Sequence, residues 1–313
     1  MTADSRALQG VWADALMPLN PDLTLHHGKL ATHIRTLGVK GVQGVILFGP
    51  TGEGLAFSAA ERIEAVRQLM SHGITGQDIV LHAGFPSVTE TVDVIQQAHQ
   101  LGLRGCIVRP PRSEDEPTET GVTNFFCQIA AHTAGVSPRL FLASPFRTGS
   151  PDLTPQVVNE VLSQHPGRYG GLIDQTRNAS HLQDWLRLYA TKLSIYANNE
   201  LQALALAKLG MNTCLSSLAN LIPSIMVGLV SPVSGAKVSV AGNAMGADDG
   251  PLLHLTRMLQ GLPEVPALKY LMSVHYHDAD WQRVRPPLSA LLPESQEKIL
   301  KDFKKYFPSG GKT

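Results

Sequence analysis

The chain has 313 residues, of which 43% are hydrophobic and 17% charged, so it can form one large domain with an appendage or two modest domains. Lys plus Arg and Asp plus Glu each number 26, and this balance argues against nucleic acid or an acidic membrane surface as a partner. The longest apolar run, residues 218–233, contains Pro223 and is too short to span a bilayer.

Cysteine usage and the first twenty residues indicate the compartment. The three cysteines lie far apart and match no metal-binding spacing, which is typical of a reducing compartment. Residues 1–20 lack the basic segment followed by an apolar segment that marks a signal peptide. We therefore expect a cytoplasmic protein with no membrane partner.

Short apolar runs alternate along the chain with longer segments of helical periodicity. The runs predicted to be strands are residues 11–18, 44–49, 78–84, 105–111, 139–145, 169–174, 194–199 and 213–219. The segments predicted to be helices are residues 58–73, 87–103, 118–135, 154–166, 179–191 and 200–211, with N-caps at Ser58, Ser87, Thr154 and Ser180. Eight strands in regular alternation with helices predict an α/β protein, a (β/α)8 TIM barrel.

Further helices follow the predicted barrel. Residues 248–262 and 266–277 have helical periodicity and are separated by joints that contain proline. We place the boundary near residue 228, so that residues 1–228 form the barrel and residues 229–313 form a C-terminal helical region.

Functional groups of a TIM barrel lie at the C-terminal ends of its strands, where the following loops converge. The polar or chemically informative residues at these predicted ends are Pro50, Thr51, Glu53, His82, Arg109, Arg112, Ser144, Arg147, Ile173, Asp174, Asn198, Asn199, Ser216 and Ser217.

Three strand ends resemble the dihydrodipicolinate synthase and N-acetylneuraminate lyase family of class I aldolases. "GPTGE" in residues 49–53 is similar to its GTTGE loop, "SPFRTG" in residues 144–149 to its YN-x-P-x-RTG segment, and "GGLIDQT" in residues 170–176 to its GIK-[DE]-x-[ST] strand. The resemblance covers nearly the whole chain in the right order. It implies a (β/α)8 barrel with a C-terminal helical region, usually assembled as a homodimer or homotetramer.

The resemblance also implies a reaction, and here the chain departs from the family. Active members bind a 2-oxo acid covalently, because a lysine amine condenses with the ketone to form a Schiff base. Ile173 stands at the lysine position, Leu142 at the position of a proton-relaying tyrosine, and Pro50 at the first loop threonine. None of the eleven lysines falls in a predicted strand or at its C-terminal end. We therefore expect the Schiff-base chemistry to be lost.

Part of the family's carboxylate site remains. Thr51 and Gly52 are predicted to bind a substrate carboxylate through a hydroxyl and backbone N–H groups, although the same loop is also consistent with a tight turn alone. Arg147 is predicted to pair with a carboxylate, or else with loop groups of the chain. Arg109 and Arg112 add positive charge near the mouth or form a solvated loop.

Two titratable residues are weaker candidates for acid-base catalysis. His82 ends the third predicted strand and Asp174 follows the lysine position, but each is also consistent with a purely structural hydrogen-bonding role. We expect no metal, because His82, Asp174 and Glu53 lie on three separate strand ends and no His-x-His pair occurs at a predicted strand end. We expect no cofactor, because neither a dinucleotide nor a P-loop fingerprint is present.

Two hypotheses remain, and the sequence leaves open whether the chain is an enzyme. In the first, it is a pseudoenzyme or regulatory homologue that binds a small, 2-oxo acid-like carboxylate at the barrel mouth or contributes only as a subunit. In the second, it is a lyase or hydro-lyase that acts on an oxo acid by a non-covalent acid-base mechanism, using His82, Asp174 and Arg147.

Overall fold

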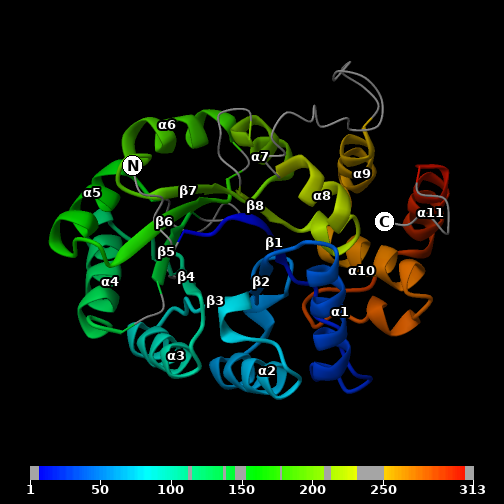
Figure 1. Cartoon of the computed structure of the whole chain (residues 1–313), viewed down its shortest axis with the longest axis horizontal. Coiled ribbons are helices and arrows are strands. Elements are labelled where there is room, and N and C mark those ends of the chain that lie inside the picture. The colour runs from blue at the N-terminus through cyan, green and yellow to red at the C-terminus, as the bar shows by residue number, and fades with distance from the viewer. Residues whose placement is uncertain are drawn as a thin grey trace.

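The computed structural model describes residues 7–111, 115–136, 139–144, 153–176, 178–207, 213–230 and 250–306. Eight parallel strands form one sheet in the order β7-β6-β5-β4-β3-β2-β1-β8. The two strands at the ends of this order, β7 and β8, contact each other, so the sheet curls into a barrel (Figure 1). The predicted TIM barrel is confirmed.

The eight strands alternate with the six predicted helices, and the structure adds two barrel helices that were not predicted, one between β1 and β2 and one after β8. The strands are β1 (Gly10–Asp14), β2 (Gly44–Leu47), β3 (Ile79–His82), β4 (Gly105–Val108), β5 (Arg139–Ala143), β6 (Tyr169–Asp174), β7 (Ser194–Ala197) and β8 (Thr213–Ser216). The barrel helices are α1 (His27–Val39), α2 (Ala59–Ser71), α3 (Val88–Gln100), α4 (Glu119–His132), α5 (Pro155–Gln164), α6 (Ala179–Tyr189), α7 (Glu200–Ala207) and α8 (Pro223–Val230).

Local signals define the helix starts. The Ser58 hydroxyl accepts from Glu61 N–H while the Glu61 carboxylate accepts from Ser58 N–H, a complete capping box. Ser87 and Thr154 cap α3 and α5 as predicted. The prediction for α6 is wrong by two residues, because Asn178 is the N-cap and its side chain accepts from the N–H of Ser180.

Two apolar layers hold the barrel together, because a parallel sheet covered by helices is buried on both faces. Alternate strand residues fill the interior, and their intervening neighbours pack against the helices. The interior cluster comprises Leu8, Trp12, Ile46, Val80, Ile107, Phe141, Ala143, Ile173, Tyr196 and Leu215. At the N-terminal end of the barrel, the N–H of Leu8 donates to the hydroxyl of Tyr196 at 2.9 Å. The interior is therefore packed with side chains.

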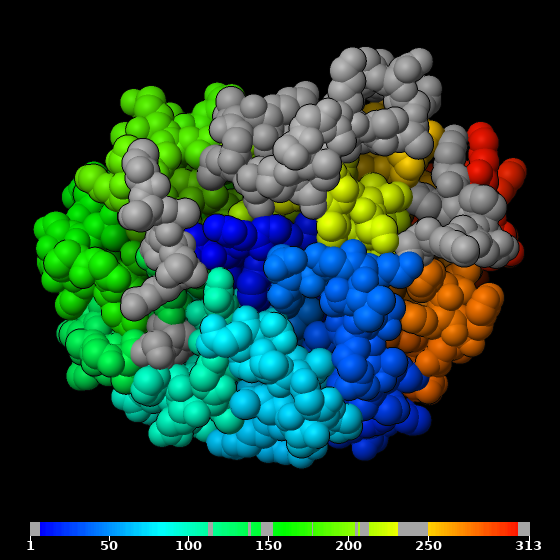
Figure 2. All heavy atoms as spheres, viewed as in Figure 1, coloured from blue at the N-terminus to red at the C-terminus, as the bar shows by residue number. Residues whose placement is uncertain are grey.

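Three C-terminal helices lie beside the barrel. They are α9 (Pro251–Leu259), α10 (Glu264–His275) and α11 (Pro293–Tyr306), and they group on one side of the molecule next to α1 and α8 (Figure 1). In the space-filling view α10 and α1 form a continuous surface (Figure 2). No helix within the described ranges is both long and apolar enough to cross a membrane.

Candidate functional site

The carboxyl group of Asp14 lies at the C-terminal end of β1. Asp14 follows Trp12 of the interior cluster by two residues, so its side chain is on the inner face of the barrel. Its Oδ2 accepts from the N–H of Thr51 at 3.1 Å, whereas its Oδ1 is buried and has no hydrogen-bond partner among the described residues. Burial raises the pKa of Asp14 to about 7, helped by the charges of Glu264 and Glu200 and opposed by the bonds from Thr51.

Sequence reasoning did not select Asp14. A carboxylate in an otherwise apolar strand is a signal that was available, but the first strand was predicted to run to residue 18, which placed Asp14 in its middle. The observed strand ends at Asp14. The residue therefore belongs to the set of strand-end groups from which a TIM barrel builds its sites.

The loop after β2 folds tightly around this carboxyl group. A Cβ on Gly49 would lie 2.3 Å from Asp14 Oδ1, and a Cβ on Gly52 would lie 2.9 Å from the carbonyl oxygen of Ala15. A Cβ on Gly54 would lie 1.8 Å from the carbonyl oxygen of Phe48. Glycine is therefore required at these positions because neighbouring atoms leave no room for a side chain.

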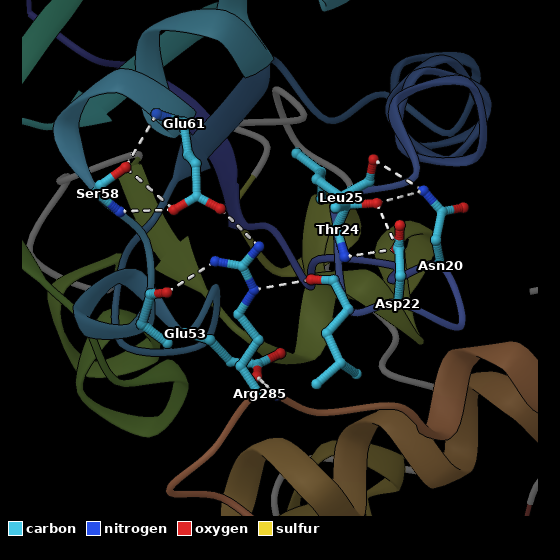
Figure 3. Close-up of polar contacts among 10 residues, drawn as sticks. Asn20, Asp22, Thr24, Leu25, Glu53, Ser58, Glu61 and Arg285 are labelled. Carbon is cyan, nitrogen blue, oxygen red and sulfur yellow. Dashed lines mark hydrogen bonds and ion pairs between the residues drawn. The ribbon is translucent and has the colours of Figure 1, made fainter.

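The C-terminal region holds the same loop from outside the barrel. Glu53 is buried, and its carboxylate pairs with Lys269 of α10 and accepts from the N–H of Arg285 at 2.7 Å. The Arg285 guanidinium in turn reaches Glu61 of the α2 capping box at 2.7 Å (Figure 3). It also lies 3.8 Å from the centre of the Phe57 ring. Lys269 also donates to the carbonyl oxygen of Arg283.

His82 occupies the end of β3 and lies on the inner face, two residues after Val80. Its carbonyl oxygen accepts from Arg62 at 2.7 Å, and Arg62 also binds the carbonyl oxygen of Gly54, which ties β3 to the glycine loop. Burial and the charges of Arg109 and Arg62 lower the pKa of His82 well below its usual value. His82 is therefore a neutral imidazole and a weak base at pH 7.

Asp174 ends β6, where its carboxylate organises the following loop. Its Oδ1 accepts from the N–H and hydroxyl of Thr176 at 2.9 and 2.7 Å, and His181 lies 3.2 Å away. The Ser144 hydroxyl is 3.4 Å from the same oxygen. Because Ile173 faces the interior, its neighbour Asp174 faces away from the barrel axis. The structure therefore does not bring Asp174 together with Asp14 and His82.

Ile173, which the sequence resemblance places at a lysine position, is a buried hydrocarbon side chain. Ile173 is 0% exposed and pairs in the sheet with Ala143 on one side and Tyr196 on the other, all within the interior cluster. Leu142 points the other way, into the layer between sheet and helices, whereas Phe141 and Ala143 face inward. None of these inward side chains of β5 carries a transferable proton.

Two glutamates, Glu200 and Glu264, lie near Asp14 on the side of β8. The carboxylate of Glu200 accepts from the Ser216 hydroxyl at 2.8 Å and from Leu218 N–H at 3.0 Å. Ser217 donates to Glu264 at 3.1 Å. Within the described residues no group of three or more His, Cys, Asp or Glu side chains is placed to hold a metal ion. The predicted residues Arg112 and Arg147 lie outside the described residues.

Eight parallel strands in a nearly closed barrel, with helices between them and polar groups at the carboxyl ends of the strands, define a (β/α)8 TIM-barrel protein. The chain belongs to the dihydrodipicolinate synthetase family, whose model matches residues 7–306. The family assignment made from the strand-end motifs is confirmed.

Individual proteins agree with this assignment. The chain is 28% identical over 214 residues to an uncharacterized DapA-like lyase of Chloroflexus aurantiacus, covering 67% of this chain and 70% of that protein. It is 26% identical over 234 residues to a 4-hydroxy-tetrahydrodipicolinate synthase of Herminiimonas arsenicoxydans, covering 75% and 78%. The dihydrodipicolinate synthase structure from Agrobacterium tumefaciens superposes with a TM-score of 0.85 at 24% identity, covering 96% of this chain and all of that one.

Proposed function

We propose that this family member binds a small, 2-oxo acid-like carboxylate non-covalently at the barrel mouth and has lost the Schiff-base reaction. The observation that supports the proposal is Ile173, a fully buried side chain without an amine at the position of the family's lysine. No lysine occurs in any of the strands β1 to β8. A ketone bound there meets no lysine amine from these strands with which to form an imine.

Lys269 does not replace the missing amine. It is fully buried, but it lies on α10, and its ammonium group pairs with Glu53 and donates to the carbonyl oxygen of Arg283. An imine requires a neutral amine with a free lone pair. Burial lowers the pKa of Lys269 below its usual value, whereas the Glu53 carboxylate acts in the opposite direction and holds the nitrogen in an ion pair.

Asp14 determines how a carboxylate ligand binds beside Thr51 and Gly52. An ionised Asp14 repels the ligand, whereas a protonated Asp14 can donate a hydrogen bond to it. Because the pKa of Asp14 is about 7, binding takes up a proton and becomes tighter as the pH falls from 8 to 6. Arg147 is proposed as the cationic partner of the ligand, and the family resemblance favours a homodimer or homotetramer.

Borohydride reduction in the presence of pyruvate tests the loss of the imine. We expect an unchanged protein mass, with an active dihydrodipicolinate synthase trapped in parallel as the positive control. A covalent adduct on this chain overturns the proposal.

Calorimetric titration with 2-oxo acids at pH 6 and pH 8 tests binding. We expect the affinity of the Asp14→Asn variant to lose its dependence on pH. If no 2-oxo acid binds at either pH, the role of a subunit without a ligand site is favoured.

A non-covalent lyase or hydro-lyase is the second candidate function, and Asp14 favours it. A carboxyl group with a pKa of about 7, and with one oxygen that has no hydrogen-bond partner among the described residues, can exchange a proton at neutral pH. Turnover of any bound oxo acid, followed by NMR, separates the two functions. We expect Asp14→Asn to abolish turnover in an enzyme, with His82→Ala and Asp174→Ala as tests of the predicted acid-base residues. A binding protein leaves every oxo acid unchanged.

A further inference from the structure

Two residues of the glycine loop, residues 48–54, have backbone angles that residues with a side chain rarely adopt. Phe48 has a φ of 60° and Glu53 a φ of 53°, and they stand at the two corners of the loop, before Gly49 and after Gly52. A Cβ atom makes this left-handed conformation unfavourable, so contacts of the two side chains must hold it. The Phe48 ring packs edge-on against Phe57, with the ring centres 5.0 Å apart. Glu53 is held by the C-terminal region instead.

Lys269 contributes to both attachments of Glu53. Its ammonium group pairs with the Glu53 carboxylate and also donates to the carbonyl oxygen of Arg283 at 2.6 Å. Two residues after Arg283, the backbone N–H of Arg285 donates to the other carboxylate oxygen of Glu53 at 2.7 Å. The side chains of Lys269 and Glu53 are 0% and 1% exposed, so solvent does not screen their attraction.

Only one residue separates Glu53 from the backbone group that binds Asp14. The N–H of Thr51 donates to Asp14 Oδ2 at 3.1 Å. A Cβ on the intervening Gly52 would lie 2.9 Å from the carbonyl oxygen of Ala15, so this residue is packed closely against the chain that follows β1. A connection this short and closely packed has little room to deform. A displacement of Glu53 therefore moves Thr51 as well.

We infer that Lys269 is a positioning residue for the barrel mouth, which holds Glu53 and thereby keeps the Thr51 N–H on Asp14. The C-terminal region thus determines how readily the mouth takes up a proton, because this bond stabilises the ionised carboxylate. Burial raises the pKa of Asp14 to about 7 although the bonds from Thr51 oppose it, so release of these bonds raises it further. This role of Lys269 does not require a ligand, and only its effect on carboxylate affinity rests on the proposed function.

NMR titration of the Asp14 carboxyl carbon in the full chain tests this role, with the resonance assigned by its loss in Asp14→Asn. We expect Lys269→Met and Glu53→Met each to raise the pKa of Asp14 by about one pH unit, because both release the bond from Thr51. Direct charge effects differ in sign: removal of the Lys269 cation raises this pKa, whereas removal of the Glu53 anion lowers it. A lower or unchanged pKa of Asp14 in Glu53→Met therefore overturns the inference.

Lys29→Met is the matched control. Lys29 also joins the C-terminal region to the barrel, since its ammonium group lies 2.5 Å from Asp278 Oδ2, but it does so from α1 and not from the glycine loop. It should leave the pKa of Asp14 unchanged. An equal rise in Lys29→Met indicates a general loosening of the C-terminal region and contradicts a specific role of Lys269.

Hydrogen exchange of the Thr51 amide separates positioning from overall stability. We expect this amide to exchange about tenfold faster or more in Lys269→Met, while the amides of β3 exchange as in the wild type. Equal acceleration in β3, or unchanged exchange at Thr51, assigns Lys269 to stability alone and overturns the inference. If a single variant does not fold, the double variant Lys269→Met/Glu53→Met leaves no buried charge without a partner, and the same results are expected from it.

Calorimetric titration with 2-oxo acids measures the consequence for the proposed function. Because Asp14 keeps its proton to a higher pH in Lys269→Met, the pH dependence of the affinity should move upward with the pKa of Asp14. If no 2-oxo acid binds at any pH, the proposed ligand is wrong, whereas the NMR titration and the exchange of Thr51 still decide the role of Lys269.

Discussion

The backbone N–H of Thr51 donates to Oδ2 of Asp14 at 3.1 Å, so a carboxyl group of the chain itself occupies an amide that was predicted to hold a ligand. The glycine loop around this bond has no room for side chains at Gly49, Gly52 and Gly54. The contacts fit the interpretation of the loop as a tight turn. In the proposed function, an external carboxylate would bind at this loop next to an internal one.

Replacement of Asp14 by Asn should stabilise the protein at high pH. Folding raises the pKa of Asp14 from 3.8 to about 7, so its favourable contribution is fully present below pH 3.8 and is lost as the pH rises through 7. Relative to Asp14→Asn, the wild type should lose roughly 2–4 kcal/mol of unfolding free energy between pH 4 and pH 8. Melting temperatures of both proteins across this range measure the effect.

Asp184→Asn is the control, because Asp184 is largely exposed. It should follow the wild type at every pH. If Asp14→Asn also follows the wild type, the carboxyl group is ionised in the folded state without penalty, and the proton-coupled binding proposed at the mouth has no basis.

His33 should cause a loss of stability in acid. It is buried, with its ring nitrogens 2.9 Å from Asn220 Oδ1 and 3.0 Å from the Tyr276 hydroxyl, and burial lowers its pKa from 6.5 to about 4. The stability it contributes is present above pH 6.5 and is lost as the pH falls through 4, by roughly 3 kcal/mol. Urea denaturation between pH 7 and pH 4 measures the loss.

The acid-dependent loss should be smaller in His33→Gln, whose side chain does not titrate. His132→Gln, at an exposed position of α4, should keep the slope of the wild type. Equal slopes in all three proteins would remove His33 as the cause.

The sequence predicted the barrel because every strand is a short apolar run and the segments of α2 to α7 have helical spacing, which are local properties of the chain. It predicted Ile173 at the lysine position because the neighbouring residues "GGLIDQT" define the alignment.

The direction in which each strand side chain points was harder to predict from the sequence. Leu142 was placed at the position of the tyrosine, yet it packs against the helices and Ala143 faces the interior. A register irregularity between Leu140 and Phe141, invisible in the sequence, accompanies this difference.

Contacts between segments that are far apart in the chain could not be predicted from the sequence either. The partners of Glu53 are Lys269 and Arg285, more than two hundred residues later in the chain. Asp14 and Thr51 meet because β1 and β2 are neighbours, and only the folded barrel brings them together. Local patterns therefore identified the elements and the family, whereas the electrostatics of the mouth required the structure.

Truncation of Ile173 should destabilise the barrel. Ile173→Ala removes buried methyl and methylene groups from the packed interior, where the side chain is 0% exposed. We expect a loss of about 2–4 kcal/mol in the free energy of unfolding, measured by urea denaturation. Leu55→Ala, at a position that is 65% exposed, should cost less than about 0.5 kcal/mol. A similar small cost at Ile173 would mean that this part of the interior is not closely packed.

The buried pair of Lys269 and Glu53 should show strong energetic coupling. Both side chains are almost completely buried, so Lys269→Met or Glu53→Gln leaves the other charge without its partner, at a cost of about 3–5 kcal/mol for each change. The double variant should cost clearly less than the sum of the two, because it leaves no uncompensated charge. Urea denaturation of the wild type, the two single variants and the double variant measures this coupling free energy.

The pair of Lys29 and Asp278 provides the comparison, with side chains that are 20% and 32% exposed. Its cycle should give a coupling of no more than about 1 kcal/mol, because solvent screens the two charges. Additive costs at Lys269 and Glu53 would show that the C-terminal helices do not hold the glycine loop through this pair. The attachment of the C-terminal region to the glycine loop would then depend on Arg285, which binds Glu53 through its backbone and Glu61 through its side chain.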